Sequence, residues 1–225
     1  NNTAVGYAAL TTNTTGDANV AVGRNALKLN TTANNNTAVG TSALEANTAA
    51  NNTAVGYDAL TANTTGTGNT ALGSSAGAAV TTGINNVALG LSSLDLCTTG
   101  GHNTSVGASA MGSGITTGND NSCFGTAAGF NISSGSNNTL LGHDAGRSGS
   151  PGGVITTHSN QINLGDENVS EANIQVDWTV ASDARDKTDF TALDLGLDFV
   201  NALAPVTYKW DKRSKYGDKS AEGYD

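Results

Sequence analysis

A short motif recurs along most of this chain at a nearly constant spacing. Each copy reads Asn, a β-forming residue, a small residue, an aliphatic residue and Gly, as in Asn2–Gly6. The glycines that close the copies are Gly6, Gly23, Gly40, Gly56, Gly73, Gly90, Gly107, Gly125, Gly142 and, in a degenerate tenth copy, Gly165. The first nine follow one another at intervals of 16 to 18 residues, and such a period is typical of a stacked repeat. Most of the chain therefore has to form its structure by stacking similar coils.

The residues of each copy favour short strands and turns over helices. Every copy carries Gly in the middle of the pattern and Asn, Thr and often Gly beyond it, and these residues are poor helix formers that suit turns. The motif itself offers one strand of about four residues. We therefore predict an all-β fold for residues 1–170: a parallel β-solenoid or β-roll of about ten coils, each of 16–18 residues.

The columns of the repeat predict which face is buried. The residue before each glycine is large and apolar, namely Val5, Val22, Val39, Val55, Leu72, Leu89, Val106, Phe124, Leu141 and Leu164. Because each buried Val or Leu contributes about 1.5–3 kcal/mol, we expect this column to form a continuous core. The residue before it lies on the opposite side of the strand and is small, as in Ala4, Ala21 and Ala54. We expect another chain to approach this small-residue face closely.

Threonine pairs form a further column, eight and nine residues after the glycine. They are Thr14-Thr15, Thr31-Thr32, Thr64-Thr65, Thr81-Thr82 and Thr98-Thr99. We predict that stacked Thr and Asn side chains form hydrogen bonds with the coils above and below. An ice-binding surface would also contain Thr columns. It requires threonines two residues apart on a flat strand, however, whereas adjacent residues of a strand point to opposite faces, so we do not favour this function.

The repeat resembles the head repeats of trimeric autotransporter adhesins, whose coils read Asn-Ser-Val-Ala-Ile-Gly. The corresponding residues here include Asn51–Gly56, and the resemblance covers residues 1 to about 146. That family forms a left-handed β-roll in which three chains pack side by side. The resemblance therefore implies a homotrimer, with the small-residue face near the threefold axis. The period in this chain is a few residues longer than in those heads.

Charge separates the last quarter of the chain from the repeats. The chain has 10 Lys and Arg residues and 19 Asp and Glu residues, for a formal net charge of −9. Residues 171–225 hold 7 of the basic and 11 of the acidic side chains, which places a boundary near residue 170. Residues 171–181 alternate polar and apolar and are predicted to form a connecting strand. An acidic rod without a basic patch is a poor ligand for nucleic acid or an anionic membrane, so neither is expected as a partner.

Residues 182–225 resemble the opening of the intramolecular chaperone domain of bacteriophage endosialidases, tail fibres and neck appendages. The resemblance rests on the polar segment Ser182–Lys187, a predicted Leu- and Phe-rich helix from Ala192 to about Leu203, and the motif Ala204–Trp210, in which Val206–Trp210 is the predicted next strand. In that family the domain assembles three chains and then cuts itself off. The resemblance thus implies that residues 182–225 are the first part of a trimerisation and folding domain.

The same resemblance names the residues of a self-cleavage reaction. It implies that Ser182 is the nucleophile, that Lys187 is its base, and that the bond Ser182–Asp183 is cut. A desolvated Lys can activate a serine hydroxyl. Asp186, however, stands where the family usually has Leu, and a carboxylate next to Lys187 favours the charged ammonium, which is a poor base. We therefore predict that the Ser182–Asp183 bond stays intact.

Two functional hypotheses follow from these resemblances. The first is a structural, host-attachment fragment of a trimeric phage tail fibre or spike in the virion tail. Its partners would be two further copies of itself, other tail proteins and a host surface receptor, with glycans among the candidates. The second is the head of a trimeric adhesin on a bacterial cell surface. Residues 182–225 show neither the heptads of a coiled-coil stalk nor the strands of a membrane anchor, which favours the first hypothesis.

The residues provide no support for an enzyme that acts on an external substrate. The histidines His102, His143 and His158 are scattered, and no carboxylate pair recurs along the repeats. We expect no cofactor and no metal site, and at most a single Ser-Lys autoproteolytic event. Cys123 occupies the small-residue column, so we expect its thiol to pack in the structure and not to join a disulfide framework.

Overall fold

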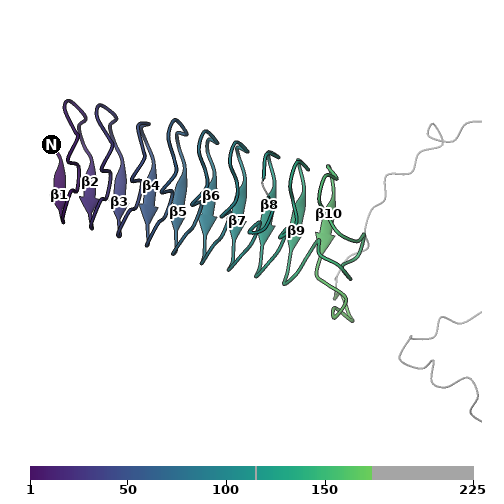
Figure 1. Ribbon diagram of the computed structural model, residues 1–225. Helices are drawn as coiled ribbons and strands as arrows, with labels where there is room; N and C mark the ends of the chain where they lie inside the picture. The colour runs from purple at the N-terminus through teal and green to yellow at the C-terminus, as the bar shows by residue number, and fades with distance from the viewer. Residues whose placement is uncertain (115, 174–225) are drawn as a thin grey trace, which may run out of the picture. The chain divides into compact units, whose positions relative to one another are not determined.

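The computed structural model describes residues 1–114 and 116–173, and in them the chain forms a parallel β-solenoid (Figure 1). Each motif provides one strand: β1 (Thr3–Val5), β2 (Val20–Val22), β3 (Thr37–Val39), β4 (Thr53–Val55), β5 (Thr70–Leu72), β6 (Val87–Leu89), β7 (Thr104–Val106), β8 (Ser122–Phe124), β9 (Thr139–Leu141) and β10 (Ile162–Leu164). These strands form a single sheet in chain order. The described residues contain no helix, and hence none that could cross a membrane. The predicted all-β solenoid is confirmed.

Several predictions fall on residues that the structure does not describe. Among them are most of the connecting strand at 171–181 and the helix Ala192–Leu203. The cleavage residues Ser182, Asp183 and Lys187 also lie outside the described part of the chain. The stack and the residues just after β10 form one compact unit, Asn1–Asn173.

The strands keep one register although the repeat length varies. Ala38 pairs with Ala54 across the 16-residue interval, and Val106 pairs with Phe124 across the 18-residue interval. The additional or missing residues are therefore accommodated in the turns. The motif, and not the exact period, determines which residues stack.

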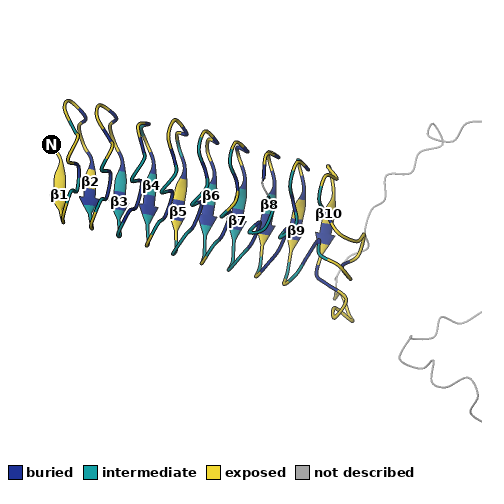
Figure 2. Ribbon diagram, viewed as in Figure 1, coloured by how far each residue is buried: buried dark blue, intermediate teal, exposed yellow. Residues whose placement is uncertain are grey.

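The predicted assignment of the two strand faces is wrong. The small residues Ala21, Ala38 and Ala54 are fully buried, with 0% of their surface exposed. The large apolar column points outward, and Leu72 and Leu141 are 51% and 53% exposed. Figure 2 shows this alternation as buried and exposed colours along the same strands. The small-residue face therefore lines the inside of each coil and cannot lie at a threefold axis.

The reason is a second apolar column that fills the interior from the arm after the glycine. It consists of Leu10, Leu27, Leu44, Leu60, Leu94 and Met111, all of them buried and all with φ between 48° and 55°. A coil of about 17 residues has little interior space, and protein interiors are close-packed. When the arm contributes a Leu, the facing strand position has room for only a small side chain. The sequence prediction overlooked this column because it considered the strand motif alone.

Asparagine side chains connect the coils through hydrogen bonds. Asn52 is buried, its Oδ1 accepts from the backbone N–H of Asn69 at 2.9 Å, and its Nδ2 donates to the carbonyl of Gly66 at 2.9 Å. The Asn residues that open the repeats form this asparagine ladder, namely Asn19, Asn36, Asn52, Asn69, Asn86, Asn103, Asn121 and Asn138. Threonines add bonds on the outside, such as Thr64 Oγ1 to the carbonyl of Thr81 at 3.0 Å. The predicted polar ladder is confirmed, and the threonine pairs lie in bends and not on a flat strand.

The motif glycines stack directly on one another. Gly56 has a φ of +141°, and a Cβ added to it would collide with the carbonyl of Gly73 in the next coil. An L side chain is strained at this φ, and the contact leaves no room for a methyl group. The repeat glycines therefore allow both the turn after the strand and the close approach of neighbouring coils.

Interior volume is exchanged between two positions three residues apart. The position of Leu60 is occupied in the next coil by Gly77, and the position of Asn63 is occupied there by Val80. A Cβ on Gly77 would lie 2.9 Å from Cδ2 of Leu60 and 3.4 Å from Cγ2 of Val80. The same exchange pairs Gly129 with Ile132. In these two coils, where Gly stands at the Leu position, an aliphatic residue three positions later thus fills the space.

This compensation predicts non-additive stability. Gly77→Leu alone should lower the free energy of unfolding by about 1–3 kcal/mol, because it overpacks the coil beside Val80. Gly77→Leu combined with Val80→Asn should be within about 1 kcal/mol of the parent, since the coil then has the Leu60 and Asn63 pattern. The new amide would also face Asn63 Oδ1, a buried atom without a hydrogen-bond partner among the described residues. Urea denaturation of the two single variants and the double variant measures the coupling, and simple additivity would refute it.

Candidate functional site

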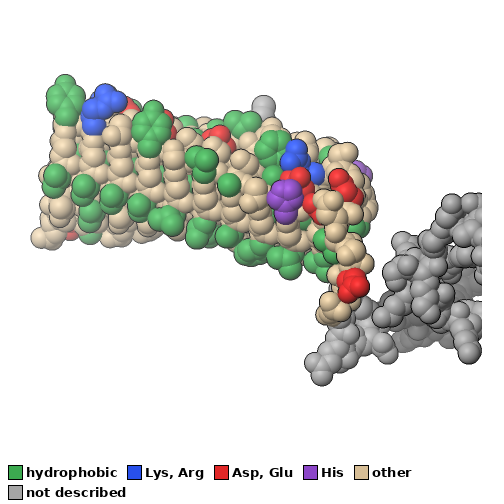
Figure 3. All heavy atoms as spheres, turned by 90° about the horizontal axis from the view of Figure 1, so that it is seen from below, with side chains coloured by type: hydrophobic (Ala, Val, Ile, Leu, Met, Phe, Trp, Pro, Cys, Tyr) green, Lys and Arg blue, Asp and Glu red, His purple; other side chains and the backbone are tan. Residues whose placement is uncertain are grey.

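The outward-facing residues of the sheet form a long uncharged surface that contains an apolar column. This outer sheet face consists of the first and third residues of β1 to β10, and none of the strand residues is charged. Its exposed members include Leu72, Leu141 and Ile162, the last with 73% of its surface exposed. Figure 3 shows hydrophobic side chains in rows along the stack. The third residues form a continuous apolar column that is exposed or partly exposed, whereas the first residues are Thr or Ser in seven of the ten strands. An apolar column of this length at the surface marks an interaction site.

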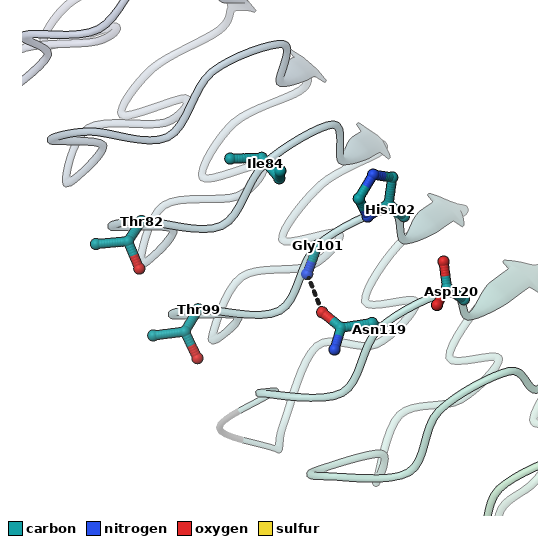
Figure 4. A pocket seen from close by; sticks show the side chains of 7 residues that line it. All are labelled: Thr82, Ile84, Thr99, Gly101, His102, Asn119 and Asp120. Atoms are coloured by element: carbon teal, nitrogen blue, oxygen red, sulfur yellow. Dashed lines mark hydrogen bonds between the residues drawn. The ribbon is translucent and has the colours of Figure 1, made fainter.

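A shallow hollow of about 510 Å³ lies on another part of the stack. Figure 4 shows its lining, which comes from three successive coils: Thr82, Ile84, Thr99, Gly101, His102, Asn119 and Asp120. Asn119 accepts a hydrogen bond from the backbone N–H of Gly101 at 2.7 Å, and Nε2 of His102 lies 3.2 Å from Nδ2 of Asn85. The hollow is an open surface groove, and its lining places no base against a nucleophile.

Polar side chains gather at the end of the stack, after β9 and β10. Nδ1 of His143 lies 3.2 Å from Oδ2 of Asp166 and 3.7 Å from Oδ2 of Asp144. Asp166 is buried, and it also accepts a hydrogen bond from the backbone N–H of Asn168 at 2.9 Å. The bonds from His143 and Asn168 hold the pKa of the Asp166 carboxyl below its usual value. Arg147 binds Asp144 at 2.7 Å, and Figure 3 shows a histidine with acidic and basic side chains beside it.

Sequence reasoning missed this cluster because it treated His143 as isolated. His143 and Asp166 are 23 residues apart, but each is the residue that follows a motif glycine, Gly142 or Gly165. Residues of one column stack on one another in a solenoid. Alignment on the glycines therefore contained the signal that brings His143 next to Asp166.

The two cysteines are unsuited to nucleophilic chemistry. Both Cys97 and Cys123 are buried free thiols. Burial raises the pKa of Cys97 to about 12 and that of Cys123 to about 12. Thiols with such pKa values remain protonated near neutral pH, and only the thiolate is the nucleophile. The packing expected for Cys123 is confirmed.

Comparison with known proteins gives one match, in the C-terminal part of the chain. Residues 182–223 match the family described as chaperone of endosialidase. The match begins at Ser182, the residue at which the expected chaperone domain begins, and it leaves the repeats uncovered. No curated protein and no solved structure matches the chain. The resemblance of residues 182–225 to this chaperone is therefore supported, whereas the tail-fibre identity and the adhesin resemblance remain predictions.

The pKa values of the cysteines predict slow alkylation of the folded protein. At pH 8, a shift of the pKa from 9.0 to about 12 lowers the thiolate fraction roughly a thousandfold, before any steric protection is counted. Iodoacetamide should therefore leave both thiols unmodified in buffer and modify both in 8 M urea, as read by intact mass. Rapid modification without urea would mean that the coils around Cys97 or Cys123 are open.

Proposed function

We propose that this chain is a structural, host-attachment part of a trimeric bacteriophage tail fibre or spike. Residues 1–170 would be its rod, and residues 182–225 would begin the domain that assembles and folds three chains. The observation that carries the proposal is the match of residues 182–223 to the chaperone of endosialidase family, on a chain whose preceding part is a repetitive solenoid. The protein would then belong to the virion tail, outside the host cell.

The construction of the solenoid suits a spacer. Each coil binds the next through strand pairing, through the asparagine ladder and through bonds such as Thr81 Oγ1 to the carbonyl of Thr98 at 2.9 Å. Nine intervals at roughly 4.8 Å give a sheet about 43 Å long. A rod of this kind can hold a receptor-binding region at a fixed distance from the particle. Other tail proteins and a host receptor, for which glycans are candidates, would be the partners of such a fibre.

The outer sheet face is the surface that we assign to trimerisation. It replaces the small-residue face, which is inside the coil. Val55 and Leu72 of adjacent strands lie side by side in register on the outer sheet face, and this apolar column continues from β1 to β10. Three copies of the chain would cover these columns along their full length, and each copy would bring the same uncharged surface to the contact.

A bacterial adhesin head is the second candidate. The observation that favours it is the motif of Asn51–Gly56, which is similar to the adhesin repeat. Both functions require three chains, so the oligomeric state alone does not separate them. Residues 182–223 favour the fibre, because their family match is to a phage-type chaperone.

Assembly through the outer sheet face predicts a position-specific effect of charge. The molar mass of the parent protein by light scattering should be three times that of one chain. Leu72→Lys should raise the protein concentration needed for trimer formation at least tenfold, because it buries unpaired ammonium groups at the contact. Leu29→Lys is the matched control, since Leu29 is 45% exposed, Leu72 is 51% exposed, and Leu29 lies off the strands. A monomeric parent, or equal effects of both variants, would contradict the assignment.

The Ser182 bond provides a separate test of the chaperone part. If the Asp186 carboxylate keeps Lys187 charged, the full chain should run as one band on a denaturing gel. Asp186→Leu should then produce two pieces split at residue 182, and adding Ser182→Ala should restore one band. If the parent protein already runs as two pieces, Asp186 does not block the reaction.

A further inference from the structure

The cluster at the end of the stack has the composition of a metal site. His143, Asp144 and Asp166 each offer one ligand atom, and these atoms all lie within 4.8 Å of one another. Ligands bound to one ion at roughly 2.0–2.2 Å lie about 3–3.5 Å apart. The distances of 3.2 Å and 3.7 Å from His143 Nδ1 to the two carboxylates are close to this separation. Small side-chain adjustments would bring the three atoms around one ion.

The hydrogen bonds of the cluster leave one ligand atom unused. Asp144 Oδ1 accepts a bond from Arg147 at 2.7 Å, while its Oδ2 faces His143 at 3.7 Å, beyond hydrogen-bond range. The imidazole Nδ1 carries at most one proton, and Asp166 already accepts it at 3.2 Å. Two carboxylates thus converge on one imidazole nitrogen that can donate to only one of them, and Asp144 Oδ2 can bind a cation while Oδ1 keeps its bond to Arg147.

The repeat does not require these residues. In the column after the glycine, the other coils carry Tyr7, Arg24, Thr41, Tyr57, Ser74, Leu91, Ala108 and Thr126. Only at β9 and β10 does this column place two potential ligands in adjacent coils, His143 and Asp166. Neither packing nor turn geometry explains why His and Asp occupy these two positions, since residues of very different size and polarity occupy the same position in the other coils.

We propose that His143, Asp144 and Asp166 bind a divalent transition-metal ion, with Zn²⁺ the best fit. One imidazole nitrogen and two carboxylate oxygens are ligands that Zn²⁺ accepts in a site of three protein ligands, and water can complete the shell. Ca²⁺ fits less well, because it takes six to eight oxygen ligands. On binding, Nδ1 loses its proton to water and Nε2 takes one up from water, and the Nε2–H can then donate a hydrogen bond to water because the His143 side chain is 64% exposed. Nδ1 is then free to bind the ion.

The ion would join β10 to β9 at the end of the stack, where the residues of the repeat motif change. Gly165 has a φ of +79°, whereas Gly56 and its neighbours are near +140°. The asparagine ladder ends at Gln161, whose backbone N–H donates to Asn138 at 2.9 Å. An ion that joins Asp166 to His143 and Asp144 would add a contact to the pairing of β10 with β9 and stabilise the C-terminal end of the stack. A ligand that binds only the folded state stabilises it by RT ln(1 + [L]/Kd), so the unfolding temperature should rise with the Zn²⁺ concentration.

The experiment uses the full chain, purified without a histidine tag and stripped of metal with a chelator. Calorimetric titration with ZnCl₂ should give one ion per chain and a micromolar or lower Kd, and saturating Zn²⁺ should raise Tm by several degrees. Asp166→Asn and His143→Gln should each weaken binding at least tenfold and abolish the rise in Tm. His102→Gln is the matched control and should behave as the parent.

Two results would overturn the site. The first is a parent Kd weaker than about 1 mM, and the second is binding that Asp166→Asn and His143→Gln leave unchanged. Asp144→Asn removes one ligand charge but keeps an acceptor for Arg147. It should also weaken Zn²⁺ binding, and it tests the site if another variant fails to fold. The result does not depend on trimer formation, because the three ligands belong to one chain.

Discussion

Hydrogen bonding between successive coils is the constraint on which the rest of this structure depends. A coil of about 17 residues cannot form a core of its own, so each coil is stable only when its polar backbone groups are paired with those of its neighbours. The asparagine ladder performs part of this pairing inside the stack, where water cannot. Asn52, for example, accepts from the backbone of Asn69 and donates to that of Gly66. The register of the strands follows from this repeated contact.

The second constraint is the narrow interior of each coil. A column of Leu on the arm requires a column of Ala on the strand, and the larger strand residues then have to face outward. The strand pattern alone predicted the parallel solenoid, its strands and its polar ladder. It could not predict which face is inside, because period-two alternation distinguishes two faces without identifying the buried one. Including Leu27, Leu44 and Leu60 in the repeat would have identified it.

The same distinction between local pattern and stacked column applies to the sites. The chaperone resemblance depends on adjacent residues from Ser182 onward and was visible in the sequence, and the family match supports it. The His143 cluster depends on residues 23 positions apart, across the one interval at which the repeat length changes most. Its ligands become neighbours only after the coils are aligned on Gly142 and Gly165. The outer sheet face can be proposed as an interface only after the buried face of the strands has been identified.

The stability of Asn52→Ala tests most directly whether the asparagine ladder holds the stack together. The substitution leaves the buried N–H of Asn69 without its acceptor, so the free energy of unfolding should fall by about 2–4 kcal/mol. The exchange protection of the Asn69 amide should fall more than that of amides several coils away. Thr65→Ala, at an exposed position in a nearby bend, should change stability by less than about 0.5 kcal/mol. If the two variants were equally stable and the Asn69 amide kept its protection, the asparagine ladder would not be what holds the coils together.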